Sequence, residues 1–153
     1  MKGLVFILSV IGLCLASGCA RGRIQKSASP ADAGRARFET YCAGCHLNEG
    51  PWMRGEAPPL EGSSWVKGPE NIVIRIVLHG LRGPIEVAGG HYNQEMPGFG
   101  PILNDADIAS LLSYVRGRFG GAPPVAEEAV SQIRGANPGR TDLWTVGELL
   151  KPP

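Results

Sequence analysis

The chain has 153 residues, with 22 glycines and 13 prolines, 43% hydrophobic residues and only 7% aromatic residues. This length allows one domain with a small core, and a formal charge of +1 lacks the basic excess that nucleic-acid binding needs. Residues 1–29 hold four basic groups and no acid, which leaves 11 basic against 14 acidic residues elsewhere. A chain so rich in loop-forming residues needs a further source of buried apolar area.

The N-terminus has the pattern of an export signal. Lys2 precedes an apolar stretch from Leu4 to Ile11, and small residues continue to Ala16. A short positive start, an apolar segment and small residues before a cleavage site are typical of secretory signals. The stretch is shorter than the roughly 20 residues of a membrane span, although a permanent transmembrane anchor is the alternative. We expect residues 1–18 to be a signal peptide.

The end of this segment resembles the bacterial lipobox: Leu15-Ala16-Ser17-Gly18-Cys19. The resemblance implies cleavage before Cys19, which would carry the lipid of a membrane anchor. Ala16 stands where Leu is usual, so ordinary cleavage near Ala20 is the alternative. Residues 19–29 lack apolar periodicity and are predicted to form a flexible tether. Both routes export the chain: the first gives a lipoprotein on the periplasmic side of a bacterial membrane, and the second a soluble periplasmic protein.

A first helix is predicted from Pro30 to about Tyr41. Ser29 can cap it, proline occupies its first turn, and Asp32 follows Ser29 by three residues, as in a capping box. Phe38 and Tyr41 are expected to face inward. This helix leads directly into a pair of cysteines.

The next five residues form a C-x-x-C-H motif, the attachment signature for c-type haem: Cys42-Ala43-Gly44-Cys45-His46. The other two cysteines, Cys14 and Cys19, fall within the export signal and at its cleavage site. Two thiols at this spacing can each add to one vinyl group of a porphyrin, while the adjacent histidine turns its imidazole onto the iron. The small residues between them allow the backbone to lie close against the ring.

Other functions for the motif fit less well. A thioredoxin-like dithiol needs a βαβ context, which the surroundings do not provide. A zinc site needs two more ligands, and His79 and His91 have eleven residues between them, not the three to five of a common zinc finger. A plain disulfide leaves His46 without a role.

Met96 is the candidate for the second axial ligand. It follows His46 by fifty residues, in a stretch too rich in Pro and Gly for helix or strand. Met53 lies only seven residues after His46, too near to reach the opposite face of the ring. His91 is the rival ligand, and an open site is a further alternative. His79 falls where a helix should end, an ordinary surface position for a cation.

Three motifs together resemble a monohaem class I cytochrome c over about residues 30–120: Cys42–His46, Pro58-Pro59-Leu60 and Met96-Pro97. More narrowly, the chain is similar to small cytochrome c modules associated with bacterial quinoprotein dehydrogenases. The resemblance implies an all-α cytochrome c fold over residues 30–121, with helices and long loops wrapped round one covalently attached haem. It also implies that the first and last helices cross, and that the Pro58 carbonyl accepts a hydrogen bond from His46.

Two more helices are expected in this domain. One runs from Pro69 to Leu78 and ends before Gly80, with two alternative sets of buried residues: Ile72, Ile76 and Leu78, or Val73, Ile74 and Val77. The other begins at Asn104 and has apolar residues at helical spacing: Ile108, Leu111, Leu112, Val115 and Phe119. The family's usual aromatic residue of the last helix corresponds to Tyr114.

Residues 122–153 lie beyond the usual end of the family domain and are expected to pack on it. A short helix is predicted over residues 126–134, and Thr145 to Glu148 has the pattern of a capping box. Trp144, Leu149 and Leu150 are expected to hold this extension on the globule, with docking onto a partner as the alternative.

Several residues are candidates for secondary contacts with the cofactor. Trp65, Arg75, Arg82 and Tyr92 could donate hydrogen bonds to the haem propionates, although each is also an ordinary core or surface residue type. The exposed haem edge is expected to be lined by small and apolar residues: Ala43, Gly44, Leu81, Gly98 and Phe99.

When an imidazole and a thioether fill both axial positions, the haem iron cannot readily bind a substrate. The change that remains available to it is the gain or loss of one electron. We therefore predict a one-electron carrier, not an enzyme, that exchanges electrons with a periplasmic dehydrogenase, a respiratory complex or a terminal oxidase. The alternative is a haem-based small-molecule sensor or a peroxidase-like enzyme whose sixth ligand leaves.

Overall fold

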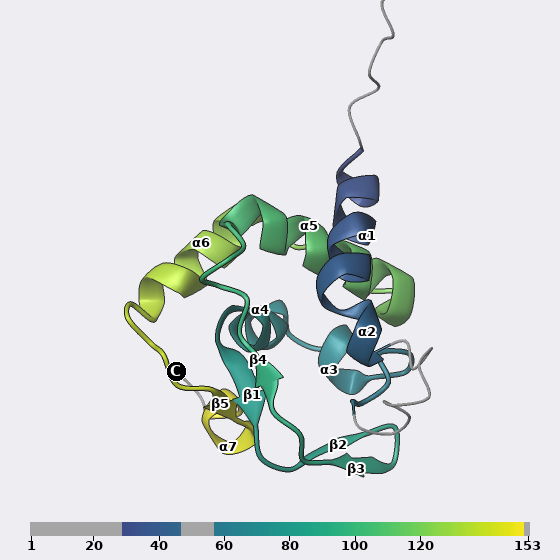
Figure 1. Ribbon diagram of the computed structural model, residues 1–153, viewed down its shortest axis with the longest axis vertical. Coiled ribbons are helices and arrows are strands. Elements are labelled where there is room, and N and C mark those ends of the chain that lie inside the picture. Colours follow the sequence, from purple (N-terminus) through teal and green to yellow (C-terminus); the bar gives the residue numbers. More distant parts are fainter. Residues whose placement is uncertain (1–28, 47–56, 152–153) are drawn as a thin grey trace, which may run out of the picture.

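The computed structural model describes residues 29–46 and 57–151. The expected signal peptide, the expected tether up to residue 28, and Met53 lie outside this part of the chain. Within it, helices dominate and are joined by loops and a few short strands (Figure 1). No helix in the described part is long and apolar enough to cross a membrane.

Helices α1 (Pro30–Tyr41) and α5 (Asp105–Val115) cross and pack together at one end of the molecule (Figure 1). The predicted start of α1 is confirmed, because the Ser29 side chain accepts from the Asp32 backbone while the Asp32 carboxylate accepts from Ser29. At the start of α5, Asn104 accepts a hydrogen bond from the backbone N–H of Asp107. Both helices therefore begin at the caps that the sequence indicates.

The α1–α5 contact is built round Phe38, which is 1% exposed. Its ring centroid lies 5.5 Å from that of Tyr114 and 5.3 Å from that of Phe119. Gly34 allows the two backbones to meet, since a Cβ there would lie 2.9 Å from the Ser110 carbonyl carbon. The prediction that Tyr41 faces inward is wrong: it lies at the end of α1, where its side chain is 38% exposed.

Helix α4 (Glu70–His79) runs through the middle of the molecule and ends at Gly80, whose φ is +83°. Its core residues come from both predicted sets, because elements pack on more than one side of it: Val73, Ile74, Ile76, Val77 and Leu78. Two single-turn helices were not anticipated from the sequence pattern, α2 (Ala43–His46) and α3 (Ser64–Lys67).

Three short strands join distant parts of the chain, in the order β4 (Met96–Pro97), β1 (Gly80–Arg82), β5 (Trp144–Thr145). Strand β1 pairs antiparallel with β4 and parallel with β5. The expectation that the stretch around Met96 contains no strand is wrong. Pro97 is tolerated because β4 is an edge strand. Its missing N–H breaks no hydrogen bond to a second neighbouring strand. A separate hairpin contains β2 (Ile85–Val87) and β3 (Gly90–Tyr92).

The chain after α5 continues as a π-helical turn, η1 (Arg116–Gly120), and then forms α6 (Glu127–Ala136) and α7 (Val146–Leu149). Helix α6 packs on α5 and α4, while β5 and α7 lie beside β1 (Figure 1). Trp144 and Leu149 are buried, but Leu150 is 60% exposed, so the expectation that it holds the extension is wrong. The strands are only two or three residues long, and the all-α fold class is confirmed.

Candidate functional site

The C-x-x-C-H motif occupies a single helical turn. Cys42 ends α1, and its carbonyl accepts hydrogen bonds from the backbone N–H groups of Cys45 (3.1 Å) and His46 (3.0 Å). This turn places residues i, i+3 and i+4 on one face. Burial raises the pKa of the Cys42 thiol to about 11, with a smaller contribution from Cys45.

The His46 ring is oriented by a backbone carbonyl. Its Nδ1–H donates to the carbonyl oxygen of Pro58 over 2.9 Å, which leaves Nε2 as the free ring nitrogen. Burial lowers the pKa of His46, and this hydrogen bond acts against the burial. A neutral imidazole held by its other nitrogen is the arrangement found in metal-ligating histidines.

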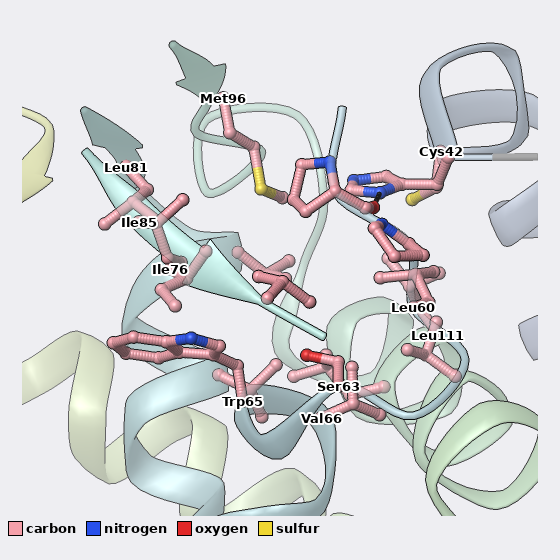
Figure 2. Close-up of a pocket in the computed structure, with 18 residues that line it drawn as sticks. Cys42, Leu60, Ser63, Trp65, Val66, Ile76, Leu81, Ile85, Met96 and Leu111 are labelled. Atoms are coloured by element: carbon pink, nitrogen blue, oxygen red, sulfur yellow. Dashed lines mark hydrogen bonds between the residues drawn. The ribbon is translucent and has the colours of Figure 1, made fainter. Parts of the chain in front are cut away.

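Met96 reaches the same place from a distant part of the sequence. Strand β4 carries it and pairs it with Leu81 of β1. Met96 is half-buried and lines a cavity together with Cys42 and His46. In Figure 2 its sulfur points into that cavity, from the same end as Cys42.

The cavity walls are almost entirely apolar and come from helices, strands and a loop that are far apart in the sequence. Ile76, Leu81 and Ile85 form one side, and Leu60 and Leu111 face them across the space (Figure 2). Its volume is about 90 Å³, and a second cavity of about 300 Å³ has several of its lining residues in common: His46, Pro58, Leu81, Ile85 and Met96. The two together form an apolar slot that opens towards the surface.

This site suits a covalently attached haem. Two thiols lie on one helical turn, an imidazole nitrogen and a thioether line one slot, and the walls offer the apolar surface that a porphyrin ring requires. Imidazole and thioether are also a ligand set that haem iron accepts. Within residues 29–46 and 57–151, no group of three His, Cys, Asp or Glu side chains is arranged to hold a metal ion directly.

The four residues that were candidates for hydrogen bonds to the haem propionates lie in different places in the structure. Tyr92 lines the second cavity. Trp65 lines the first, but its indole N–H donates to the Glu86 carbonyl over 3.2 Å, so this donor is already used. Arg75 lines neither cavity: its guanidinium carbon lies 5.6 Å from the ring centroid of Trp144. Arg82 is exposed, and neither cavity includes it.

The residues expected at the haem edge differ in their burial. Gly44 is exposed, whereas Leu81 is only 7% exposed and forms part of the slot wall. Gly98 packs closely on α4, since a Cβ there would lie 2.6 Å from the His79 carbonyl carbon. Phe99 is half-buried, with its ring centroid 5.9 Å from that of Tyr41.

The rival histidine ligands lie outside the slot. His91 is exposed on β3, opposite Glu86, and lines neither cavity. His79 is half-buried at the end of α4, where its Nδ1–H donates to the Arg140 carbonyl over 3.2 Å. The surface position expected for His79 is therefore wrong, because the C-terminal extension covers it.

Several wall residues were not anticipated from the sequence. Val66 and Ser63 line the slot from α3 and its N-cap, while Ile85 and Val87 come from β2. The alternation of Ile85, Glu86 and Val87 is a strand signal that could have found the second pair. A four-residue helix such as α3 offers too short a pattern to be recognised.

An apolar slot with a C-x-x-C-H turn at its edge and a methionine on its wall defines a cytochrome c domain. The chain belongs to the cytochrome c family whose model is described as cytochrome c oxidase, cbb3-type, subunit III, which matches residues 29–115. Members of this family carry covalently attached haem c, with its iron, and transfer electrons; the domain itself is not catalytic.

Relatives include both small carriers and parts of larger complexes. The chain is 34% identical to cytochrome c-552 of Thermus thermophilus over 114 residues, which cover 68% of this chain and 76% of that protein. It is 37% identical over 112 residues to a subunit of the nicotinate dehydrogenase of Pseudomonas putida, covering 69% of this chain and 9% of that polypeptide. It is 32% identical over 109 residues to the fructose dehydrogenase cytochrome subunit of Gluconobacter japonicus, covering 66% and 22% respectively.

Proposed function

We propose that this chain is an exported one-electron carrier in which His46 and Met96 are the axial ligands of a haem attached through Cys42 and Cys45. The observation that carries the proposal is the meeting of Cys42, His46 and Met96 in one apolar cavity, although Met96 lies fifty residues further along the chain. When bound, the haem supplies the one-electron couple of its iron.

The side chains of the slot have separate tasks. The Pro58 carbonyl fixes the tautomer and rotation of His46, which makes its Nε2 a better electron donor to a metal. The apolar walls exclude water from the slot. Ferric haem iron carries one more positive charge than ferrous iron, so this apolar environment disfavours the ferric state relative to the ferrous state. Tyr92 is the contact we propose for the polar edge of the ring, because it lines the more open cavity.

Substitution of the proposed ligand tests the assignment. In Met96→Ala holo-protein we expect loss of the methionine–iron charge-transfer absorption band and a site open to added imidazole. His91→Ala and Met53→Ala serve as matched controls for the other histidine and methionine, and both should keep the wild-type spectrum. An unchanged spectrum in Met96→Ala rules out this ligand pair.

Ligand binding by the unmodified protein separates an electron carrier from a sensor or a peroxidase-like enzyme. With His46 and Met96 both on the iron, the reduced protein should not bind carbon monoxide at neutral pH. Ready binding would favour the small-molecule sensor or peroxidase-like alternative.

We propose that residues 1–18 are removed on export and that Cys19 carries the lipid of a membrane anchor, followed by a tether over residues 19–29. The lipobox-like Leu15–Cys19 segment supports this, and so does the absence of acidic residues before Asp32. Mass spectrometry of the mature N-terminus should find a lipidated Cys19. An unmodified mature N-terminus near Ala20, with the red protein in the soluble periplasmic fraction, would contradict the anchor.

The partner we propose is a periplasmic dehydrogenase, a respiratory complex or a terminal oxidase. Two of the relatives are named as dehydrogenase subunits, and the family model is named for an oxidase subunit. Encounters between redox proteins have small interfaces and exchange rapidly. Complexes isolated from native membranes should contain the chain with a dehydrogenase whose substrate reduces its haem, or with an oxidase that reoxidises it.

A further inference from the structure

The C-terminal extension pairs with β1, the strand that lies next to the Met96 strand β4. Leu81 of β1 pairs with Met96 on one side and with Trp144 on the other. The three-stranded ladder therefore joins residues 81, 96 and 144 in one register. Its strands β4, β1 and β5 are labelled in Figure 1. Residues 122–151 thus complete a structure that includes a wall of the slot.

Trp144 is the side chain through which this attachment acts. It is 8% exposed and packs in a cluster with Ile76, Leu81 and Leu149, against which Met96 also packs. Ile76 and Leu81 are themselves walls of the slot. Trp144 therefore supports, from outside, the same residues that contact the Met96 side chain from inside.

The Trp144 ring is fixed by packing and by a cation, not by a hydrogen bond of its own. The guanidinium carbon of Arg140 lies 3.5 Å from the ring centroid, and Arg140 also binds Glu148 over 3.1 Å. Such a cation over an indole face stabilises its position. The indole Nε1 is buried without a hydrogen-bond partner, so the shape of the ring matters more than its N–H.

A second tie from the extension reaches the chain just after Met96. Arg134 of α6 donates to the carbonyl oxygens of Gly100 (2.8 Å) and Leu103 (2.9 Å), and its Nε donates to Asp105 over 2.7 Å. The extension therefore holds the Met96 segment indirectly, through its pairing with β1, and directly through the loop that follows Met96.

We infer that Trp144 is a positioning residue for Met96: it holds β1, and through β1 the ligand strand, so that the thioether keeps its place against competing ligands. This inference rests on the proposed ligation by His46 and Met96. Trp144 touches neither cavity directly, so its action is transmitted through Ile76 and Leu81.

The test measures the affinity of the ferric holo-protein for imidazole, which competes with Met96 for the iron. Trp144→Ala should bind imidazole at least about tenfold more tightly than wild type, equivalent to about 1.4 kcal/mol. Its methionine–iron absorption band should weaken in parallel. Trp144→Phe retains one aromatic ring and loses the pyrrole part of the indole with its unpartnered N–H, so its imidazole affinity should lie closer to the wild-type value than that of Trp144→Ala.

Val130→Ala is the control for a general loss of stability in the extension, because Val130 is fully buried in α6 and lines neither cavity. Its imidazole affinity should stay within about twofold of wild type, less than about 0.5 kcal/mol. Wild-type affinity in Trp144→Ala, or an equal increase in Val130→Ala, overturns the inference. If Trp144→Ala does not retain haem, Trp144→Leu is measured in its place, and wild-type affinity there overturns it equally. Met96→Ala, measured in parallel, reports separately on the ligation itself.

Discussion

The two proposed axial ligands are held by regions of different construction. His46 follows α1, which is fixed by its own caps and by packing on α5 round Phe38. Met96 lies in a two-residue edge strand that pairs with residues 80–82, and these pair in turn with residues 144–145. The helical region is stabilised by side-chain burial within two long elements, and the ladder by backbone pairing among three segments far apart in the chain.

This difference indicates where each ligand is vulnerable. A helix of twelve residues keeps its geometry when one contact weakens, because its hydrogen bonds are internal. A strand of two residues has no internal hydrogen bonds to maintain its geometry, so its position depends on the strands that pair with it. Changes in the helical region should therefore reduce global stability, whereas changes in the ladder should in addition alter the bond between Met96 and the iron.

The largest effect is expected at the crossing of α1 and α5. Gly34→Val places side-chain atoms against the Ser110 backbone and 3.0 Å from Tyr114 Cβ, so the helices must separate. We expect a loss of more than about 3 kcal/mol of unfolding free energy, at the upper end of overpacking costs. Gly135→Val on α6 is the control, because nothing lies within 4 Å of a Cβ there. Urea denaturation of both variants measures the difference, and similar midpoints would contradict the tight crossing.

The next largest effect should come from the joint between the ladder and the extension. Gly80 has a φ of +83°, and a Cβ there would press on the Met96 carbonyl and on Leu143, and lie 2.9 Å from Gly98 N. Gly80→Ala should cost about 2–3 kcal/mol, from the left-handed backbone and the crowding together.

Gly83→Ala provides a matched control for this substitution. Gly83 has a φ of +85°, and no atom lies within 4 Å of a Cβ built there. Gly83→Ala should therefore lose only the free energy of placing alanine in a left-handed backbone, about 1 kcal/mol. Denaturation separates the two costs, and imidazole affinity should rise only in Gly80→Ala. If Gly83→Ala raises it equally, the effect does not depend on contact with the Met96 strand.

These differences between regions also explain what could be predicted from the sequence. The caps Ser29 and Asn104 act within one turn, so a short window contains the whole signal for α1 and α5. The C-x-x-C-H motif is likewise local, since its chemistry requires adjacent residues. Pro58 could be named from family spacing, and the structure places its carbonyl 2.9 Å from His46 Nδ1.

The ladder could not be predicted in this way. Strands β4 and β5 have two residues each, too few to show any periodicity, and their pairing with β1 spans up to 63 residues from Leu81 to Trp144. Arg75 shows the same difficulty for single side chains. Its charge suggested a haem contact, but only the packing of the extension shows that it faces Trp144.

A smaller effect is expected at Arg116, which joins the helical region to the extension. It is 5% exposed, and its guanidinium donates to three carbonyl oxygens: Val66 and Gly68 at 2.9 Å, and Pro123 at 3.1 Å. Arg116→Met leaves these acceptors buried without a donor and should cost about 2 kcal/mol. Arg118→Met, two residues away, removes an exposed pair with Glu61 and a guanidinium 5.2 Å from the Phe119 ring centroid, and should change stability by less than about 1 kcal/mol. Equal urea midpoints for the two variants would show that the buried guanidinium adds no net stability.

The smallest effect is a pH dependence confined to the extension. Hydrogen bonds from the Thr145 side chain and backbone, and from Arg140, lower the pKa of Glu148 from 4.5 to about 2. Because the folded-state pKa is depressed, the unfolded chain binds more protons between these values, so this stability is complete above about pH 4.5 and is lost as pH falls towards 2. The difference in urea midpoint between wild type and Glu148→Gln should therefore shrink across that range.

Asp32 provides the comparison in the helical region. Its pKa is lowered below 3.8 by hydrogen bonds from Ser29, so the stability that it contributes to α1 is lost only at lower pH than the onset for Glu148. Near pH 4, Glu148→Gln should thus have lost part of its effect while Asp32→Asn keeps most of its own. Acid should therefore weaken the extension, which supports the Met96 strand, before it weakens the helix that leads to His46. Equal pH profiles for the two variants would contradict this order.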